Sequence, residues 1–435
     1  MSKAIDPHPV TETLSAMADS YVADGRPWVV AYSGGKDSTL VLQLVYETLA
    51  ALGPRAIKPV FVVSSDTGVE PPNVAEHVGA VLAAVRADAR RRAIGITPIL
   101  VQPTVEDGFW GKLIGRGYPP PTRWFRWCTT NMKIKPSRRA IDKIVAEHGS
   151  VVLFLGSRRA ESSSRAARMD GRRTNLRQLN PHHEIPNAFV ATPIADWSDD
   201  DVWQYLYENN PPPWGLPHDR MLTLYRQALG GECPIVMDLN TPSCGGSRFG
   251  CWVCTVVKVD KSMEGFIQSG ETWMAPLAGY RDWLKKFRDA PGVRMDTRRD
   301  GSKGPGPFTF ESRQKLLSEL LKRESDVKIP LISDDEIRYI QGVWSAEFDL
   351  ENNAIRIARQ AGREIAGGNI VPLSPDDRAL LDDIAADHGI NPNLIAKVLE
   401  MEGEFPNLDS FGAKPALKRV LTDIIVAAEG AEAGA

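Results

Sequence analysis

The hexapeptide Ser33-Gly34-Gly35-Lys36-Asp37-Ser38 constrains the fold most, because it lies directly between an apolar run at 28–32 and an apolar stretch at 40–52. This order predicts a strand, a glycine turn and a helix. The two glycines allow backbone conformations that a Cβ forbids, so several N–H groups and the positive end of the helix can converge on an anion. The lysine and the two serine hydroxyls are placed to complete the cage. The sequence therefore predicts a phosphate-binding loop.

The loop differs from a Walker A loop, which requires a glycine five residues before Gly35 and a Ser or Thr after the lysine. Val30 and Asp37 occupy those two positions. The hexapeptide instead resembles the pyrophosphate loop of ATP pyrophosphatases, the superfamily that includes phosphoadenosine phosphosulfate (PAPS) reductases, ATP sulfurylase small subunits and tRNA-thiolating enzymes. Members typically cleave ATP between its α and β phosphates. The alternative is a solvated Ser/Gly turn, which the strand-to-helix context disfavours.

This resemblance implies that the loop binds ATP and that Lys36 and Asp37 are catalytic. The lysine and the loop N–H groups would stabilise charge that develops on the departing pyrophosphate. Mg²⁺ is expected to bridge the phosphates. The implied nucleotide-binding residues of the loop are Ser33, Gly34, Gly35, Lys36, Asp37 and Ser38.

Short apolar runs alternate with segments of helical spacing, which predicts an α/β fold with a doubly wound parallel sheet. Ligands of such sheets bind beyond the carboxyl ends of the strands, where each motif described here is expected. The resemblance implies the adenine nucleotide alpha hydrolase-like type of this fold. The predicted strands are 28–32, 59–64, 96–101 and 151–155, and the predicted helices between them include 74–92 and 137–148.

The chain of 435 residues is long enough for one large domain and an appendage. We expect a pyrophosphate-loop domain at 1–230, a four-cysteine segment at 231–300 and a helical C-terminal region at 301–435. Helical periodicity in that last region is found at 311–323, 334–347 and 376–388. The net charge of −3 requires that any nucleic-acid partner be held by local basic patches.

The first twenty residues mix charges and prolines without an apolar core of signal-peptide length. The chain shows no apolar run that approaches a membrane span, so we expect no membrane partner. Five cysteines without a signal are better explained as metal ligands or reactive thiols than as disulfides. A cytoplasmic location is expected.

Two further motifs resemble those of the PAPS reductase group. Asp66 follows the second predicted strand and can contact a ribose or adenine, or can cap the next helix. Arg158 and Arg165 match a Gly-x-Arg-x-x-Glu-Ser-x-x-Arg pattern after the fourth strand. The resemblance implies that these three residues bind the nucleotide. The stretch 158–177 carries a net charge of +5, which suits polyphosphate or a nucleic-acid backbone but also a solvated loop.

The segment 193–205 also matches that group, but its residues have a structural explanation. Ser198 precedes three aspartates, which is typical of a residue that caps a helix with acids in its first turn. We therefore assign this segment to structure.

Cys128 lies in the segment 123–133, which interleaves arginines and aromatic residues. Nearby cations favour the thiolate, the reactive form of cysteine. A lone cysteine is often only a small buried hydrophobe, but the flanking Arg126 and Lys133 and the resemblance to an Arg-x-Cys-Thr-x-x-x-Lys element favour a nucleophile or sulfur carrier. The same segment has the chemistry to contact nucleic acid.

The remaining cysteines are Cys233, Cys244, Cys251 and Cys254, and four thiolates within such a short stretch can reach one metal centre. Chemically, they suit zinc as well as an iron–sulfur cluster.

Taken together, the motifs resemble the DndC/SspD proteins of bacterial DNA phosphorothioation, over about residues 25–350 and including Gly306–Glu311. That resemblance implies a [4Fe-4S] cluster on the quartet and an ATP-dependent sulfurtransferase that acts on DNA in a restriction–modification setting. It also implies a cysteine desulfurase as sulfur donor and further phosphorothioation subunits as partners. Sulfur would arrive as a persulfide on Cys128 or through the cluster.

Two other functions remain open. The first is a PAPS or adenylylsulfate reductase, although no cysteine follows Cys254 at the position of the C-terminal catalytic cysteine of such enzymes. The second is a non-catalytic nucleotide-binding scaffold. Cleavage of ATP to AMP and pyrophosphate distinguishes a sulfurtransferase from both, because neither a reductase nor a scaffold needs to cleave ATP.

Overall fold

The protein is described here from a computed structural model. It describes residues 7–161, 166–167, 169, 176, 179–228, 249–347, 349 and 351–365, and single residues at 383, 386 and 389. The chain divides into two compact units, Met1–Tyr339 and Ile340–Ala435.

Within the described residues, six strands form one sheet in the order β3-β2-β1-β4-β6-β5. All neighbouring strands are parallel except the short antiparallel pair β5–β6. This arrangement confirms the predicted parallel α/β sheet. The strands are β1 (Trp28–Tyr32), β2 (Val60–Ser65), β3 (Ile96–Val101), β4 (Val151–Phe154), β5 (Asn180–Pro181) and β6 (Ala188–Ala191).

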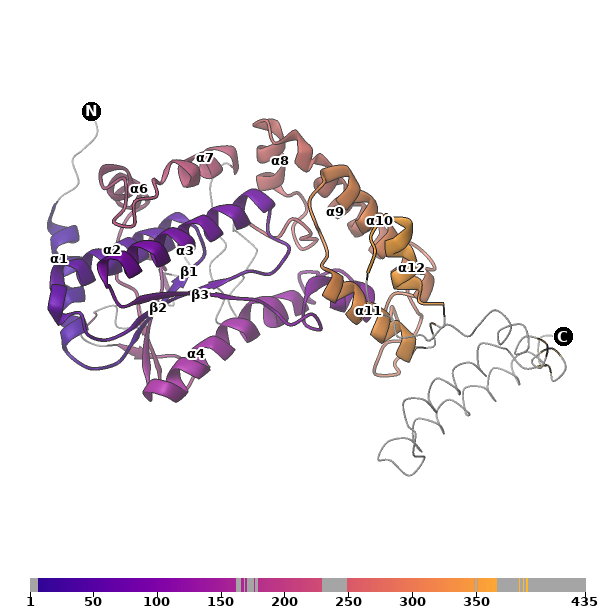
Figure 1. The fold of residues 1–435 in the computed structure, drawn as a ribbon, viewed down its shortest axis with the longest axis horizontal. Coiled ribbons are helices and arrows are strands. Elements are labelled where there is room, and N and C mark those ends of the chain that lie inside the picture. The colour runs from indigo at the N-terminus through magenta and orange to yellow at the C-terminus, as the bar shows by residue number, and fades with distance from the viewer. Residues whose placement is uncertain are drawn as a thin grey trace, which may run out of the picture. The chain divides into compact units, whose positions relative to one another are not determined.

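Helices cover both faces of the sheet, as a doubly wound fold requires. Figure 1 shows α2 (Lys36–Leu52) and α3 (Pro72–Arg92) on one face and α4 (Lys135–His148) on the other. Because β2 lies on one side of β1 and β4 on the other, the direction of winding reverses between β1 and β4. Such a reversal opens a crevice at the carboxyl ends of the two strands.

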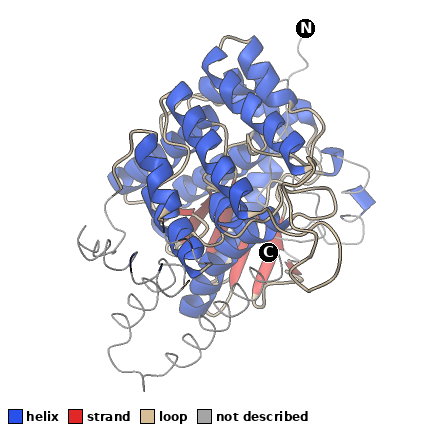
Figure 2. Ribbon diagram, turned by 90° about the vertical axis from the view of Figure 1, so that its right-hand side faces the viewer, coloured by secondary structure: helices blue, strands red, loops and turns tan. Residues whose placement is uncertain are grey.

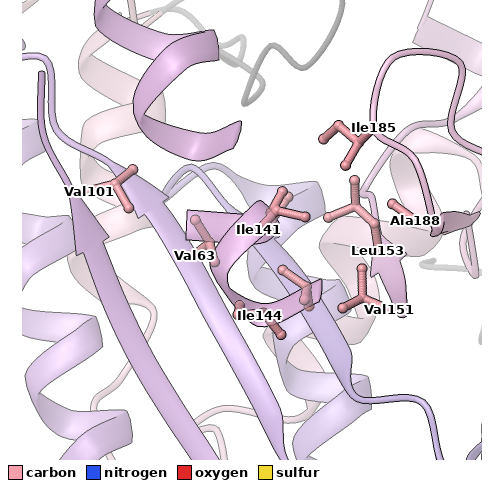
Figure 3. Close-up of a cluster of buried hydrophobic side chains, with 10 residues drawn as sticks. Val63, Val101, Ile141, Ile144, Val151, Leu153, Ile185 and Ala188 are labelled. Atoms are coloured by element: carbon pink, nitrogen blue, oxygen red, sulfur yellow. The ribbon is translucent and has the colours of Figure 1, made fainter. Parts of the chain in front are cut away.

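One part of the core lies between the sheet and α4. Ile141 and Ile144 of α4 pack against a cluster that includes Val29, Val63 and Leu153 of three neighbouring strands (Figure 3). All five residues of β1 are buried, so the strand contributes to both faces. This pattern explains the continuous apolar run that precedes the phosphate loop.

Figure 2 shows the other helices of the described residues in blue and the strands in red. They are α1 (Pro7–Val22), α6 (Asp199–Glu208), α7 (Asp219–Ala228), α8 (Lys261–Gln268), α9 (Ala275–Arg288), α10 (Phe310–Val327), α11 (Asp334–Ala346) and α12 (Asn353–Gln360). Short helical turns are η1 (Gly53–Arg55), η2 (Gly111–Gly115), η3 (Thr129–Ile134), η4 (Arg159–Glu161) and η5 (Thr272–Met274), of which η2 and η3 are π-helical.

Most predicted elements are confirmed to within a few residues at each end. The predicted helices at 311–323 and 334–347 are α10 and α11, whereas the one at 376–388 falls almost wholly outside the described residues. The sequence analysis missed α1, β5 and β6, and it also predicted no helix at α7, α8, α9 or α12. In the part of the chain that the structure describes, no helix has both the length and the apolar character that crossing a membrane requires.

Candidate functional site

The loop between β1 and α2 has the geometry that its sequence predicts. Gly34 has a φ of +79°, and a Cβ at this position would lie 2.5 Å from Cγ2 of Val78. Both the backbone conformation and the close approach of α3 therefore require glycine. The Ser38 hydroxyl donates to the Gly35 carbonyl at 2.9 Å and accepts from the Ser33 N–H at 3.2 Å. The two serines thus fasten the ends of the loop to each other.

Lys36 begins α2 and is covered by the later helices α6 and α7. Its Nζ lies 3.3 Å from a carboxylate oxygen of Asp37 and 3.3 Å from one of Asp199. The backbone N–H of Lys36 donates to the hydroxyl of Tyr225 at 3.0 Å. The Tyr225 hydroxyl of α7 therefore accepts a hydrogen bond from an N–H group that an anion bound to this loop would need.

Asp37 and Arg158, both expected to bind nucleotide, pair with each other. Each side chain is only 1% exposed, and Arg158 Nε donates to Asp37 Oδ1. The same guanidinium donates to Asp199 at 2.6 Å and to the Trp197 carbonyl at 3.3 Å. The segment after β4 and the first turn of α2 approach closely here, because a Cβ on Gly156 would lie 2.9 Å from the Asp37 carbonyl carbon. This ion pair holds the end of β4 against the first turn of α2.

Asp199 has a second role that the sequence analysis missed. The predicted cap is confirmed, because Ser198 Oγ accepts from the Asp201 N–H at 3.1 Å. Asp199 itself bridges Arg158 and Lys36. Burial acts to raise the pKa of Asp199, but Arg158 and Lys36 hold it below its usual range. Nothing in the local sequence distinguishes this bridging aspartate from its two acidic neighbours.

A cleft opens at the carboxyl ends of β1, β2 and β3. It brings together Ser33 of the loop, Asp66 after β2, Lys133 of η3 and the thiol-bearing Cys251. The Asp66 carboxylate accepts from the Gly68 N–H at 2.8 Å and from Gln102 Nε2 at 2.7 Å, so its orientation is fixed. The other lining residues are Ser65, Glu70, Val74, Ala75, Val78, Gly79, Leu100 and Phe249.

Two titratable groups near the loop have unusual surroundings. Burial raises the pKa of Glu70 in the cleft to about 7, although Lys133 acts to lower it. Burial lowers the pKa of His77 to about 4, with Arg220 and His218 adding to the effect. His77 lies beside Gly34, and its ring nitrogens have no hydrogen-bond partner of normal geometry among the described residues. The chemistry available at the loop therefore includes a neutral imidazole, which the sequence analysis did not single out.

The three described cysteines lie at two places around this region. Cys128 is partly exposed and immediately precedes η3, whose Lys133 lines the cleft. Cys251 lines the cleft directly, with its Sγ 3.7 Å from Thr67 Oγ1. The turn 251–254 is held at the end of β2, because the Trp252 N–H donates to the Val69 carbonyl at 2.9 Å. Of the predicted thiols, Cys251 alone belongs to the described lining of the cleft.

The metal prediction is only partly open to inspection. Cys233, Cys244 and the predicted nucleotide ligand Arg165 lie outside the described residues. Among the residues described, no three His, Cys, Asp or Glu side chains converge as a metal site. Cys251 and Cys254 are both partly exposed on one tight turn, in which the Cys254 N–H donates to the Cys251 carbonyl at 3.0 Å. Two thiols in this arrangement fit half of a four-thiolate ligand set.

Comparison with known proteins identifies relatives for more than half of the chain. A family model for the phosphoadenosine phosphosulfate reductase domain matches residues 27–257. An uncharacterized protein of Methanocaldococcus jannaschii is 28% identical over 62% of this chain and 46% of its own length. Sulfate adenylyltransferase subunit 2 of Shewanella frigidimarina is 27% identical over 46% of this chain and 62% of its own length. The chain thus spans less than two thirds of either relative.

Solved structures give weaker similarities. A phosphate complex of the PAPS reductase of Candida auris aligns with 52% of this chain and 93% of its own, at 15% identity and a TM-score of 0.31. The U34-tRNA thiolase NcsA of Methanococcus maripaludis with its [4Fe-4S] cluster aligns with 65% of this chain and 80% of its own, at 10% identity and a TM-score of 0.29. Scores this low support no conclusion about this chain.

The buried pair predicts a large loss of stability for Arg158→Met. The substitution leaves the buried Asp37 carboxylate without its guanidinium, which typically costs about 3–5 kcal/mol of unfolding free energy. Urea denaturation measures this loss. The matched control is Arg338→Ala, which removes the exposed pair with Asp335 and should cost less than about 1 kcal/mol. Equal losses in the two variants would contradict a structural role for the Asp37–Arg158 pair.

Glu70 predicts a specific pH dependence of stability. Its folded-state pKa of about 7 exceeds the ordinary value of 4.5, so its contribution to stability is present below pH 4.5 and is lost as the pH rises to 7. Glu70→Gln removes this titration, and the variant should therefore gain stability relative to the parent protein across that window. Urea midpoints at a series of pH values test this. Glu76→Gln provides a control of opposite sign, because Arg220 lowers the pKa of Glu76.

Proposed function

Since the chain belongs to the phosphoadenosine phosphosulfate reductase domain family, we propose that it is the ATP-dependent sulfurtransferase subunit of a DNA phosphorothioation system. The observation that carries this proposal is the shared cleft. Ser33 of the phosphate loop and the Cys251 thiol line the same cavity, so an activating site and a sulfur-bearing side chain lie within one chamber. A reductase that receives an already activated sulfate has no need of a loop for the pyrophosphate of ATP.

Activation of a DNA phosphodiester is the first chemical requirement, because its oxygen is a very poor leaving group. A non-bridging oxygen of the DNA backbone attacks the α phosphorus of ATP, and pyrophosphate leaves. Lys36 and the loop N–H groups stabilise the charge on that leaving group, and one well-placed donor is worth about 3–4 kcal/mol. Mg²⁺ bound to the phosphates of the nucleotide would neutralise part of their charge.

Sulfur transfer is the second requirement. A sulfur nucleophile attacks the adenylated DNA phosphorus, and AMP leaves with the original oxygen. If the nucleophile is a persulfide on Cys128, a second thiol must then reduce the S–S bond to release the product. Cys251 and Cys254, with Cys233 and Cys244, would hold a [4Fe-4S] cluster, which when bound would supply the alternative route for sulfur.

Residues around the loop allow a polyphosphate to replace the Asp199 carboxylate beside Lys36. Asp199 is 63% exposed, so its carboxylate can turn towards water when a polyphosphate takes its place beside Lys36. The Arg158 guanidinium keeps Asp37 paired throughout. We infer that Asp37 fixes the lysine and the helix rather than contacting the nucleotide. A cysteine desulfurase and further subunits would be the protein partners.

Lys36→Ala should abolish release of pyrophosphate from ATP, because the loop loses its cation. Its fold should persist, because Arg158 still pairs with both carboxylates that Lys36 contacts. Pyrophosphate is measured in a coupled assay, and phosphorothioate dinucleotides are measured by mass spectrometry of genomic DNA from cells complemented with each variant.

The control for this test is Lys135→Ala, which removes a partly exposed lysine paired with Asp107 and should leave both readouts unchanged. Full turnover in the Lys36→Ala variant would contradict the assignment of the loop. Binding of ATP by the parent protein without AMP and pyrophosphate would favour the scaffold or the reductase.

Anaerobically purified protein should be brown and contain iron, and Cys251→Ser should remove that iron. Cys128→Ser is the matched control and should retain it, because Cys128 is not part of the quartet. Absorbance in the visible range and metal analysis measure both. A colourless protein with stoichiometric zinc would rule out the iron–sulfur cluster.

A further inference from the structure

One of the most exposed aromatic side chains lies in a small turn just before Cys128. Trp124 is 97% exposed and Phe125 is 43% exposed. The turn is ordered, because Thr122 and Phe125 exchange backbone hydrogen bonds at 3.1 and 3.3 Å. The Thr122 hydroxyl also accepts from the Phe125 N–H at 3.1 Å. A rigid turn that holds an indole in water has no explanation in packing.

A second segment, the hairpin-like loop 294–308, reaches Tyr118, which also contacts this turn. Its backbone is held by bridges between Arg294 and Phe308 and between Thr297 and Lys303. Tyr118 joins the two segments: Phe125 stacks on it with ring centroids 6.2 Å apart, and the Arg299 guanidinium lies 5.1 Å from its ring centroid. We call the residues 122–126 and 294–308 together the Trp124 surface.

The charge of the Trp124 surface differs from that of the whole protein. The surface carries a net charge of +4, whereas the chain carries −3. Four of its basic residues are exposed, Arg126 and Arg294 are half-buried, and the exposed side chains of Trp124, Phe125 and Met295 (51%) belong to the same surface. The basic residues are Arg123, Arg126, Arg294, Arg298, Arg299 and Lys303, and the acidic ones are Asp296 and Asp300.

We propose that the Trp124 surface binds a DNA strand by stacking an unpaired base on Trp124 and by pairing its arginines with phosphates. This inference rests on the proposed function and names the surface that would engage the DNA substrate. An exposed indole flanked by cations offers an aromatic face for base stacking and positive charges for phosphates, the combination that holds single strands. The base must be unpaired, because a base inside a duplex has both faces covered by its neighbours and cannot stack on the indole.

The position of the surface suits that role. The chain runs from Arg126 to Cys128 and directly into η3, whose Lys133 lines the cleft. The turn that carries Trp124 is therefore joined to the cleft by one short helical segment of the chain. A flat apolar patch for a protein partner would lack this density of arginine, and its binding would depend little on salt.

Fluorescence anisotropy with labelled single-stranded and duplex oligonucleotides tests the proposal on the full chain. Trp124→Ala should weaken single-strand binding about tenfold, because base stacking contributes strongly at such sites. Trp124→Phe, which keeps an aromatic face, should lose less. Tyr207→Ala is the matched control, since Tyr207 of α6 is 75% exposed but lies outside the Trp124 surface, and it should bind as the parent does. Arg123→Ala should lower the slope of log affinity against log salt by about 0.7.

The outcomes separate the two levels of inference. If the parent protein and the Trp124→Ala variant bind single strands with equal affinity, the proposal for the Trp124 surface is wrong, but the proposed function is unaffected. Parent protein that binds no DNA of either kind overturns both. Loss of binding to a purified desulfurase, with DNA binding intact in Trp124→Ala, would mark the surface as a protein interface and overturn the proposal. ATP affinity is measured in each variant, because a misfolded variant would lose it.

Discussion

The buried ion pair between Asp37 and Arg158 is the contact on which the rest of the site depends. Two charges with almost no exposure are tolerable only when each is satisfied, since an unpaired buried charge costs several kcal/mol. Here the pair joins the first turn of α2 to the segment after β4. Those elements flank the point where the sheet reverses its winding. The loop Ser33–Ser38 is therefore fixed at the edge of a crevice before any ligand arrives.

The cysteine turn at 251–254 reaches the same crevice through aromatic packing. Trp252 lies next to the rings of Trp110 and Tyr280, with centroids 6.0 and 5.9 Å away, and Trp110 donates to the Leu331 carbonyl at 2.7 Å. Arg281 of α9 donates to the Cys254 carbonyl at 2.9 Å. Helices that follow the cysteines in sequence thus position them against the strands that precede them. The resulting cleft belongs to one packed unit rather than to a flexible appendage.

Sequence reasoning predicted the elements whose signals are local. The apolar run of β1, the glycine pair and the cap at Ser198 each follow from residues within a few positions of one another, and all three are present. The pairing of Asp37 with Arg158 spans 121 positions, and that of Lys36 with Tyr225 spans 189. No periodicity or spacing encodes such contacts, because they arise only when the sheet and the later helices pack. Arg158 matches a nucleotide-binding motif in sequence, but its partner in the structure is Asp37, and only the packed fold reveals this.

The tyrosine on the loop has a thermodynamic consequence. An anion that binds the Lys36 N–H must displace the Tyr225 hydroxyl. The N–H then exchanges one protein acceptor for the anion, and no water has to be removed from it. The displaced residue belongs to α7, which is followed directly in the chain by residues 229–248 with Cys233 and Cys244. Anion binding and the contact of Tyr225 with the loop are therefore coupled through this one N–H, and the coupling is reciprocal. Whatever strengthens the contact of Tyr225 with the loop weakens the binding of an anion there, and a bound anion weakens that contact by the same factor.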